Sequence, residues 1–276
     1  LYVDDVLLLG ANKQLLDKLK KKLMDRFKMT DMDDVSRVLG MNITRDREEG
    51  AITINQKDYT EDIVQRYGMW GYNLGYTPGV GPQLSLDQPD ENLLNKEGKR
   101  RYQSIMGAAI YVAQVCRYDI LYTVNQLARV MSKASKACIE AAKHPLCYLA
   151  GSTDFLITHE QGGFKVAAFS DANWGANPYN GKSTSPHIII LANGPISFKV
   201  SIQELTAQST MEAEMVATAL TVKKAVSCSN VMLELSFKEG FGSMTHYIDN
   251  TSVLRAAGNR TYSSRAKHIA LRHISE

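Results

Sequence analysis

The part of the chain that most restricts its fold is residues 164–257, where strand and helix patterns follow one another in a defined order. Apolar, β-branched segments predict three strands, and the Asn193-Gly194 pair between the second and third predicts a tight hairpin turn. A long helical pattern, a fourth strand and a second helix come next. The predicted strands cover 164–170, 185–191, 196–200 and 247–249, and the predicted helices cover 206–234 and 252–257. This order predicts a mixed sheet with flanking helices.

Two of these strands end in aspartate. Asp171 follows the first strand and Asp249 closes the fourth, while the helix between them carries Glu212 and Glu214. If the two strands are parallel neighbours, both aspartates lie at the sheet edge where ligands usually bind. Such carboxylates cannot all ionise together without cations, and two Mg²⁺ ions about 4 Å apart would relieve the repulsion and clamp a phosphodiester. The competing interpretation is that strand-end acids serve only as turn formers and helix caps.

Only one of the two glutamates can join such a cluster. Positions two apart on a helix are rotated by about 200°, so their side chains point to opposite flanks. Apolar residues within 213–220 mark the buried face, and each glutamate lies about 100° from its centre. Periodicity therefore leaves Glu212 and Glu214 as alternatives.

A second acidic feature lies at the N-terminus. Asp4 and Asp5 are adjacent within residues 1–9, which are otherwise apolar or β-prone. Burial penalises unpaired charge, so the pattern predicts a β-hairpin with both acids at its tip, where they would coordinate Mg²⁺. The same residues also fit a solvated Asp-Asp turn.

The intervening region changes from mixed to helical character. It predicts a helix over 12–27, strands over 38–43 and 51–54, a helix over 58–67 ended by Gly68, a Pro- and Gly-rich linker over 77–96, and helices over 101–113, 119–131 and 137–149. Pro145 lies inside the last helix and is expected to kink or shorten it. A second boundary is predicted at 151–163.

Composition limits the class of protein. The 276 residues are 44% hydrophobic and 22% charged, as in ordinary globular domains. A net charge of +3 permits a phosphate-binding surface without requiring one. Apolar runs are too short for a membrane span. The four cysteines lack C-x-x-C spacing, which favours reduced thiols in an intracellular protein.

Taken together, ordered motifs along nearly the whole chain resemble the C-terminal part of a copia-type retrotransposon polyprotein, comprising reverse transcriptase and RNase H. The motifs are Tyr2-Val3-Asp4-Asp5, Leu39-Gly40-Met41-Asn42-Ile43, Tyr102-Gln103-Ser104-Ile105-Met106-Gly107, Arg117-Tyr118-Asp119-Ile120, Ser170-Asp171-Ala172-Asn173-Trp174, Ser209-Thr210-Met211-Glu212-Ala213-Glu214 and Lys267-His268-Ile269.

The resemblance implies a fold of mixed α+β and α/β class in three parts. Residues 1–78 would be a partial polymerase palm, 79–160 a linker with a helical thumb or connection region, and 161–276 a C-terminally truncated RNase H-like domain. The implied location is intracellular, in a cytoplasmic virus-like particle or the nucleus, with no membrane partner.

The resemblance also implies roles for the acids. Asp4 and Asp5 would be two metal-binding aspartates of the palm, and Asp171, Glu214 and Asp249 would be RNase H carboxylates, with Glu212 as the fallback for Glu214. The implied cofactor is Mg²⁺ or Mn²⁺ in two-metal sites. The implied partners are primer-template nucleic acid and an RNA–DNA hybrid.

Departures from the family pattern bear on activity. The chain begins after the position expected for the first palm aspartate, and Ala270 stands where a fourth RNase H aspartate is expected. We therefore expect a fragment inactive as an RNA-directed DNA polymerase and impaired as a ribonuclease H. The alternative is an inactive nucleic-acid-binding remnant of a decayed element. Its basic surface would come from Lys18, Lys20, Lys21, Arg265, Lys267 and Arg272.

Overall fold

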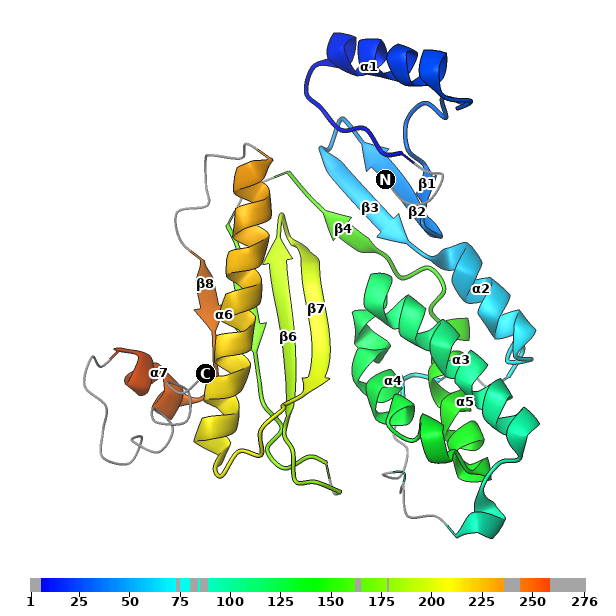
Figure 1. Cartoon of the computed structure of the whole chain (residues 1–276), viewed down its shortest axis with the longest axis vertical. Coiled ribbons are helices and arrows are strands. Elements are labelled where there is room, and N and C mark those ends of the chain that lie inside the picture. The colour runs from blue at the N-terminus through cyan, green and yellow to red at the C-terminus, as the bar shows by residue number, and fades with distance from the viewer. Residues whose placement is uncertain are drawn as a thin grey trace.

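The computed structural model of the chain describes residues 6–72, 75–79, 84, 89–161, 165–177, 179–235 and 244–258. These residues form a mixed α and β structure with seven α-helices and two four-stranded sheets (Figure 1). Among them, no helix combines the length and apolar character needed to cross a membrane.

The first sheet has the order β1-β2-β3-β4 and is antiparallel throughout. Its strands are β1 (Arg37–Val38), β2 (Met41–Asp46), β3 (Ala51–Asn55) and β4 (Ile157–His159). The strand predicted over 38–43 is divided into β1 and β2 at Leu39 and Gly40, which both have positive φ, and the strand predicted over 51–54 is confirmed as β3. Strand β4 was not predicted; it lies within the predicted boundary at 151–163 and pairs with β3 from about a hundred residues further along the chain.

A helical region provides the main core. It contains α2 (Lys57–Arg66), α3 (Lys96–Val115), α4 (Leu121–Ala128) and α5 (Lys136–Ala150). Tyr102 is fully buried between them, and its hydroxyl donates to the carbonyl of Leu127 at 2.8 Å. All four helices were predicted. Pro145 does not shorten α5, which runs through it to Ala150, with the proline buried in the core.

A buried arginine fastens this helical core to the segment that leads into β4. The Arg117 side chain is 3% exposed. Its guanidinium donates to the carboxylate of Asp119 and to the carbonyl and hydroxyl of Ser152, at 2.8, 2.8 and 2.6 Å. It also lies over the rings of Tyr148 and Phe155, 5.3 and 4.9 Å from their centroids. The Arg117 side chain therefore connects the end of α3 to the end of α5 and to the segment that leads into β4.

The second sheet has the order β7-β6-β5-β8. Its strands are β5 (Ala167–Ser170), β6 (Thr184–Leu191), β7 (Gly194–Ile202) and β8 (Thr245–Tyr247). β5, β6 and β7 are antiparallel neighbours, whereas β8 lies parallel to β5. Helix α6 (Thr210–Glu234) packs along β5 and β6, and α7 (Thr251–Gly258) contacts α6 (Figure 1).

The β6–β7 hairpin was predicted, but its turn is one residue earlier than expected. Leu191 pairs with Gly194, so the turn is Ala192-Asn193, with φ values of 52° and 62°. Two positive φ angles define the type I′ turn that matches strand twist. Gly194 instead belongs to β7, because β4 passes close to it: a Cβ there would lie 2.5 Å from the Thr158 carbonyl oxygen.

We therefore expect Gly194→Ala to lower the free energy of unfolding by about 1–3 kcal/mol through overpacking. Gly107→Ala is the matched control, since a Cβ at this exposed position of α3 meets nothing within 4 Å. The control should raise stability by up to about 1 kcal/mol, because alanine favours helix over glycine. Urea denaturation measures both, and a neutral Gly194→Ala would contradict the close approach of β4.

The N-terminal region differs most from expectation. Helix α1 (Lys13–Arg26) was predicted, and the Asn12 side chain caps it by accepting from the amide of Leu15. For the predicted hairpin at 1–9, Asp4 and Asp5 lie outside the described residues. The described part, residues 6–10, is not in a strand, and Leu9 is 78% exposed. Of the described apolar side chains expected to fix a hairpin against a core, Val6, Leu7 and Leu9 are exposed and Leu8 is half-buried.

Candidate metal centre

Three carboxylates converge where β5 and β8 end. Asp171 directly follows β5, Asp249 lies two residues after β8, and Glu214 stands near the start of α6. One oxygen from each lies within 4.8 Å of the other two. Asp171 and Asp249 are exposed, whereas Glu214 is only 7% exposed. The centre therefore has one buried ligand and two at the surface.

Parallel pairing of β5 and β8 places the two aspartates side by side. Phe169 pairs with Tyr247 in this ladder, so Asp171 and Asp249 each lie two residues beyond a paired position. A side-chain hydrogen bond of 2.9 Å between Ser170 Oγ and His246 Nε2 joins the same two strands. Burial lowers the pKa of His246, which favours the neutral ring. Local register thus fixes the spacing of the two surface ligands.

Hydrogen bonds at the start of α6 distinguish the two glutamates. Glu212 turns back toward the preceding loop, where its Oε2 accepts from the Gln208 amide at 2.7 Å, while its own amide donates to the capping hydroxyl of Ser209. Glu214 points instead toward Asp171, and its Oε1 accepts from the Ala172 amide at 3.2 Å. The structure therefore brings Glu214 into the cluster and leaves Glu212 as a helix-capping side chain.

The charged form of the Glu214 carboxyl is disfavoured by its surroundings. Burial, followed by the nearby charge of Asp171, raises the pKa of Glu214 to about 7. Its Oε2 is buried and has no hydrogen-bond partner among the described residues. An unpaired buried acceptor is costly, so a cation at this position would satisfy the atom and reduce the repulsion.

The donor set fits a hard divalent cation. All three ligands are carboxylates, which Mg²⁺ and Mn²⁺ prefer. The three oxygens lie within 4.8 Å of one another, so Asp171, Glu214 and Asp249 are close enough together to hold such a cation.

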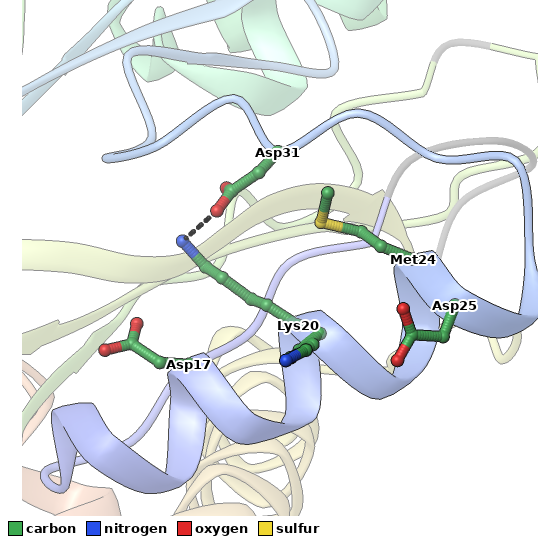
Figure 2. A pocket seen from close by; sticks show the side chains of 6 residues that line it. Asp17, Lys20, Met24, Asp25 and Asp31 are labelled. Carbon is green, nitrogen blue, oxygen red and sulfur yellow. Dashed lines mark ion pairs between the residues drawn. The ribbon is translucent and has the colours of Figure 1, made fainter.

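Most of the other candidate residues are not described by the structure. Asp4, Asp5, Ala270, Arg265, Lys267 and Arg272 lie outside the described residues. Lys20 on α1 forms an ion pair with Asp31 at 2.9 Å, and Figure 2 shows Asp17 and Asp25 lining the same hollow. These acids offset the charge of the lysine run there. The arrangement favours a solvated helix face at Lys18, Lys20 and Lys21 over a surface that binds nucleic acid.

Sequence reasoning missed the residues that hold this centre together. The indole of Trp174 donates to the Ala207 carbonyl at 2.9 Å, which ties the segment after Asp171 to the loop before α6. Gln203, in the same loop, donates to the Ala213 carbonyl at 2.8 Å. Neither spacing nor periodicity could have identified these bonds, because they depend on how the loop before α6 folds against the sheet and the helix.

Comparison with known proteins shows what the chain is similar to. Residues 1–81 match the family model described as reverse transcriptase (RNA-dependent DNA polymerase). The retrovirus-related Pol polyprotein from transposon TNT 1-94 of Nicotiana tabacum is 29% identical over 99% of the chain and 21% of its own length. The corresponding polyprotein from transposon RE2 of Arabidopsis thaliana is 30% identical over 98% of the chain and 18% of its own length.

A shorter relative is similar over most of its own length. An uncharacterized mitochondrial protein of Arabidopsis thaliana is 30% identical over 80% of the chain and 90% of itself. The chain spans only about a fifth of the Pol polyproteins that it matches. No solved structure matches the chain. The chain is therefore similar to Pol polyproteins from plant retrotransposons, and its first 81 residues match the reverse transcriptase family.

Proposed function

We propose that residues 161–276 contain an RNase H-type centre that binds divalent cations and acts on the RNA strand of RNA–DNA hybrids. The observation that carries the proposal is the convergence of Asp171, Glu214 and Asp249, with one oxygen of Glu214 buried and unpartnered. The mixed sheet order β7-β6-β5-β8, with α6 on the sheet, supports the RNase H-like layout.

The three carboxylates would have different roles in holding the cation. A bound divalent cation activates water and stabilises the leaving oxygen of a phosphodiester. Glu214 would be the fixed inner ligand, since the Ala172 amide orients its Oε1. Asp171 and Asp249 would be the outer ligands, because both are exposed and can meet a substrate phosphate.

We also propose that Asp4 and Asp5 correspond to metal-binding aspartates of a polymerase palm. The match of residues 1–81 to the reverse transcriptase family supports this assignment. Primer-template nucleic acid would be the partner of that region. The hybrid-cleaving centre would be independent of it, because its three carboxylates all come from the second sheet and α6.

The test is cleavage of a labelled RNA–DNA hybrid in Mg²⁺ or Mn²⁺. Because Ala270 occupies the position expected for a fourth aspartate, we expect slow cleavage that Ala270→Asp raises by at least about tenfold. Asp171→Asn should abolish the signal, and Asp4→Asn should leave it unchanged. Cleavage that survives Asp171→Asn would rule out this centre as its source.

Ala270 also supports the alternative, an inactive remnant that still holds hybrid through its phosphates. In that case, hybrid binding at low salt would weaken steeply as salt is added. The unsubstituted chain would then not cleave the hybrid. Cleavage by the unsubstituted chain that Asp171→Asn abolishes would exclude this alternative.

A further inference from the structure

Gln203 is a buried amide placed between the second sheet and the start of α6. It lies in the loop between β7 and α6, with its side chain 2% exposed. Its Nε2 donates to Ser185 Oγ and to the carbonyl of Ala213, both at 2.8 Å. Its backbone amide donates to the carbonyl of Ser183 at 2.9 Å. One residue thus links the start of β6 to the first turns of α6.

The contacted carbonyl belongs to the residue between the two glutamates. Each residue of an α-helix turns the side chain by about 100°, so a small rotation of α6 would carry Glu214 away from Asp171. The hydrogen bond from Gln203 to Ala213 opposes such a rotation from the sheet side. The Trp174–Ala207 bond restrains the same loop from the Asp171 side.

The orientation of the amide follows from its neighbours. Reversing it would set Oε1 against the carbonyl oxygen of Ala213, where neither atom can donate. With Nε2 on that side, Oε1 is buried and has no hydrogen-bond partner among the described residues. An unsatisfied buried acceptor is unfavourable. The amide therefore keeps its two donated hydrogen bonds at the cost of leaving Oε1 unpaired.

We infer that Gln203 is a positioning residue for the carboxylate centre, acting through Ala213 to hold Glu214 against Asp171 and Asp249. The inference rests on the proposed metal-binding function. It extends that function by assigning the geometry of the centre to a residue that is not itself a ligand.

The test compares two buried glutamines in the full chain. Gln203→Met removes the donor with little change of volume. Gln56→Met is the matched control, because Gln56 is also 2% exposed and both of its side-chain polar atoms lack partners among the described residues. Mn²⁺ binding is followed by the loss of the free-ion EPR signal, and folding by thermal unfolding. We expect at least fivefold weaker Mn²⁺ binding in Gln203→Met and unchanged binding in Gln56→Met.

The outcomes separate the inference from the proposed function. If Asp171→Asn loses Mn²⁺ binding while folded Gln203→Met binds as tightly as the unsubstituted chain, Gln203 has no positioning role and the metal centre stands. If the unsubstituted chain does not bind Mn²⁺, both the positioning role of Gln203 and the proposed metal centre are wrong. A purely structural role would lower the melting temperature without weakening binding by the folded chain.

A second variant covers failure of Gln203→Met to fold. Ser185→Ala removes the acceptor that ties the Gln203 amide to β6, so the bond from this amide to Ala213 restrains α6 less firmly from the sheet side. We expect it to weaken Mn²⁺ binding by about twofold or more. Unchanged binding in folded Ser185→Ala would then overturn the positioning role.

Discussion

Replacing Arg117 by methionine is expected to lower the free energy of unfolding by about 2–4 kcal/mol. The substitution removes all the guanidinium hydrogen bonds to Asp119 and Ser152 at once. It leaves the carbonyl of Ser152 without this donor and Asp119 without its charge partner, in a region where Arg117 is 3% exposed. Methionine can refill part of the volume, but it cannot replace these donors.

Lysine should not rescue the site. It keeps the positive charge but lacks the planar fork that reaches Asp119 and Ser152 together and lies over the rings of Tyr148 and Phe155. We therefore expect Arg117→Lys to lose at least half of the stability lost by Arg117→Met.

Arg66→Met is the control for this experiment. Its ion pair with Asp62 is half exposed, and such pairs contribute less than about 1 kcal/mol. Urea denaturation of the variants measures the differences. Equal losses in Arg66→Met and Arg117→Met would contradict the role assigned to Arg117.

Elements with strong local signals could be predicted from the sequence. Helix α1 begins at the Asn12 cap, and α2 is followed by Gly68 with φ of 74°. Such caps and stops act within a few residues, so periodicity and composition suffice to find them. The parallel pairing of β5 with β8 was the condition on which the two aspartates would meet, and the structure shows this pairing.

Features decided by long-range contacts could not be predicted. The Ala192-Asn193 turn differs from the expected Asn193-Gly194 turn because β4 approaches Gly194 from another part of the chain. The separate environments of Glu212 and Glu214 depend on the Gln208 and Ala172 amides. Helical periodicity places both glutamates equally far from the buried face, so only the tertiary contacts distinguish them.

The second large effect is expected at Glu214. Glu214→Gln should raise the free energy of unfolding at about pH 8, without divalent cations, by about 1–3 kcal/mol. The pKa of this carboxyl is raised to about 7 from an ordinary value of 4.5, chiefly by burial and then by Asp171. A raised carboxyl pKa means that the unfolded chain ionises first, so the wild-type protein loses stability as the pH rises from about 4.5 to about 7.

Glutamine removes this loss, because it carries no charge at any pH and can still accept from the Ala172 amide. The difference between variant and wild type should therefore vanish below about pH 4.5, where the glutamate is protonated in both states. Urea denaturation across the pH range measures it. A constant difference from acid to alkaline pH would show that the effect does not come from ionisation of Glu214.

Divalent cations should reverse the order of stability of the wild-type chain and Glu214→Gln. A cation that binds only the folded state stabilises it in proportion to the logarithm of its concentration over Kd. Millimolar Mg²⁺ or Mn²⁺ should therefore raise the stability of the wild-type chain at about pH 8 more than that of Glu214→Gln. Glu212→Gln is the matched control on the same helix, since its carboxylate accepts from Gln208 outside the cluster, and it should respond to the cation as the wild type does. If Glu212→Gln lost the cation response and Glu214→Gln kept it, the inner ligand would be Glu212.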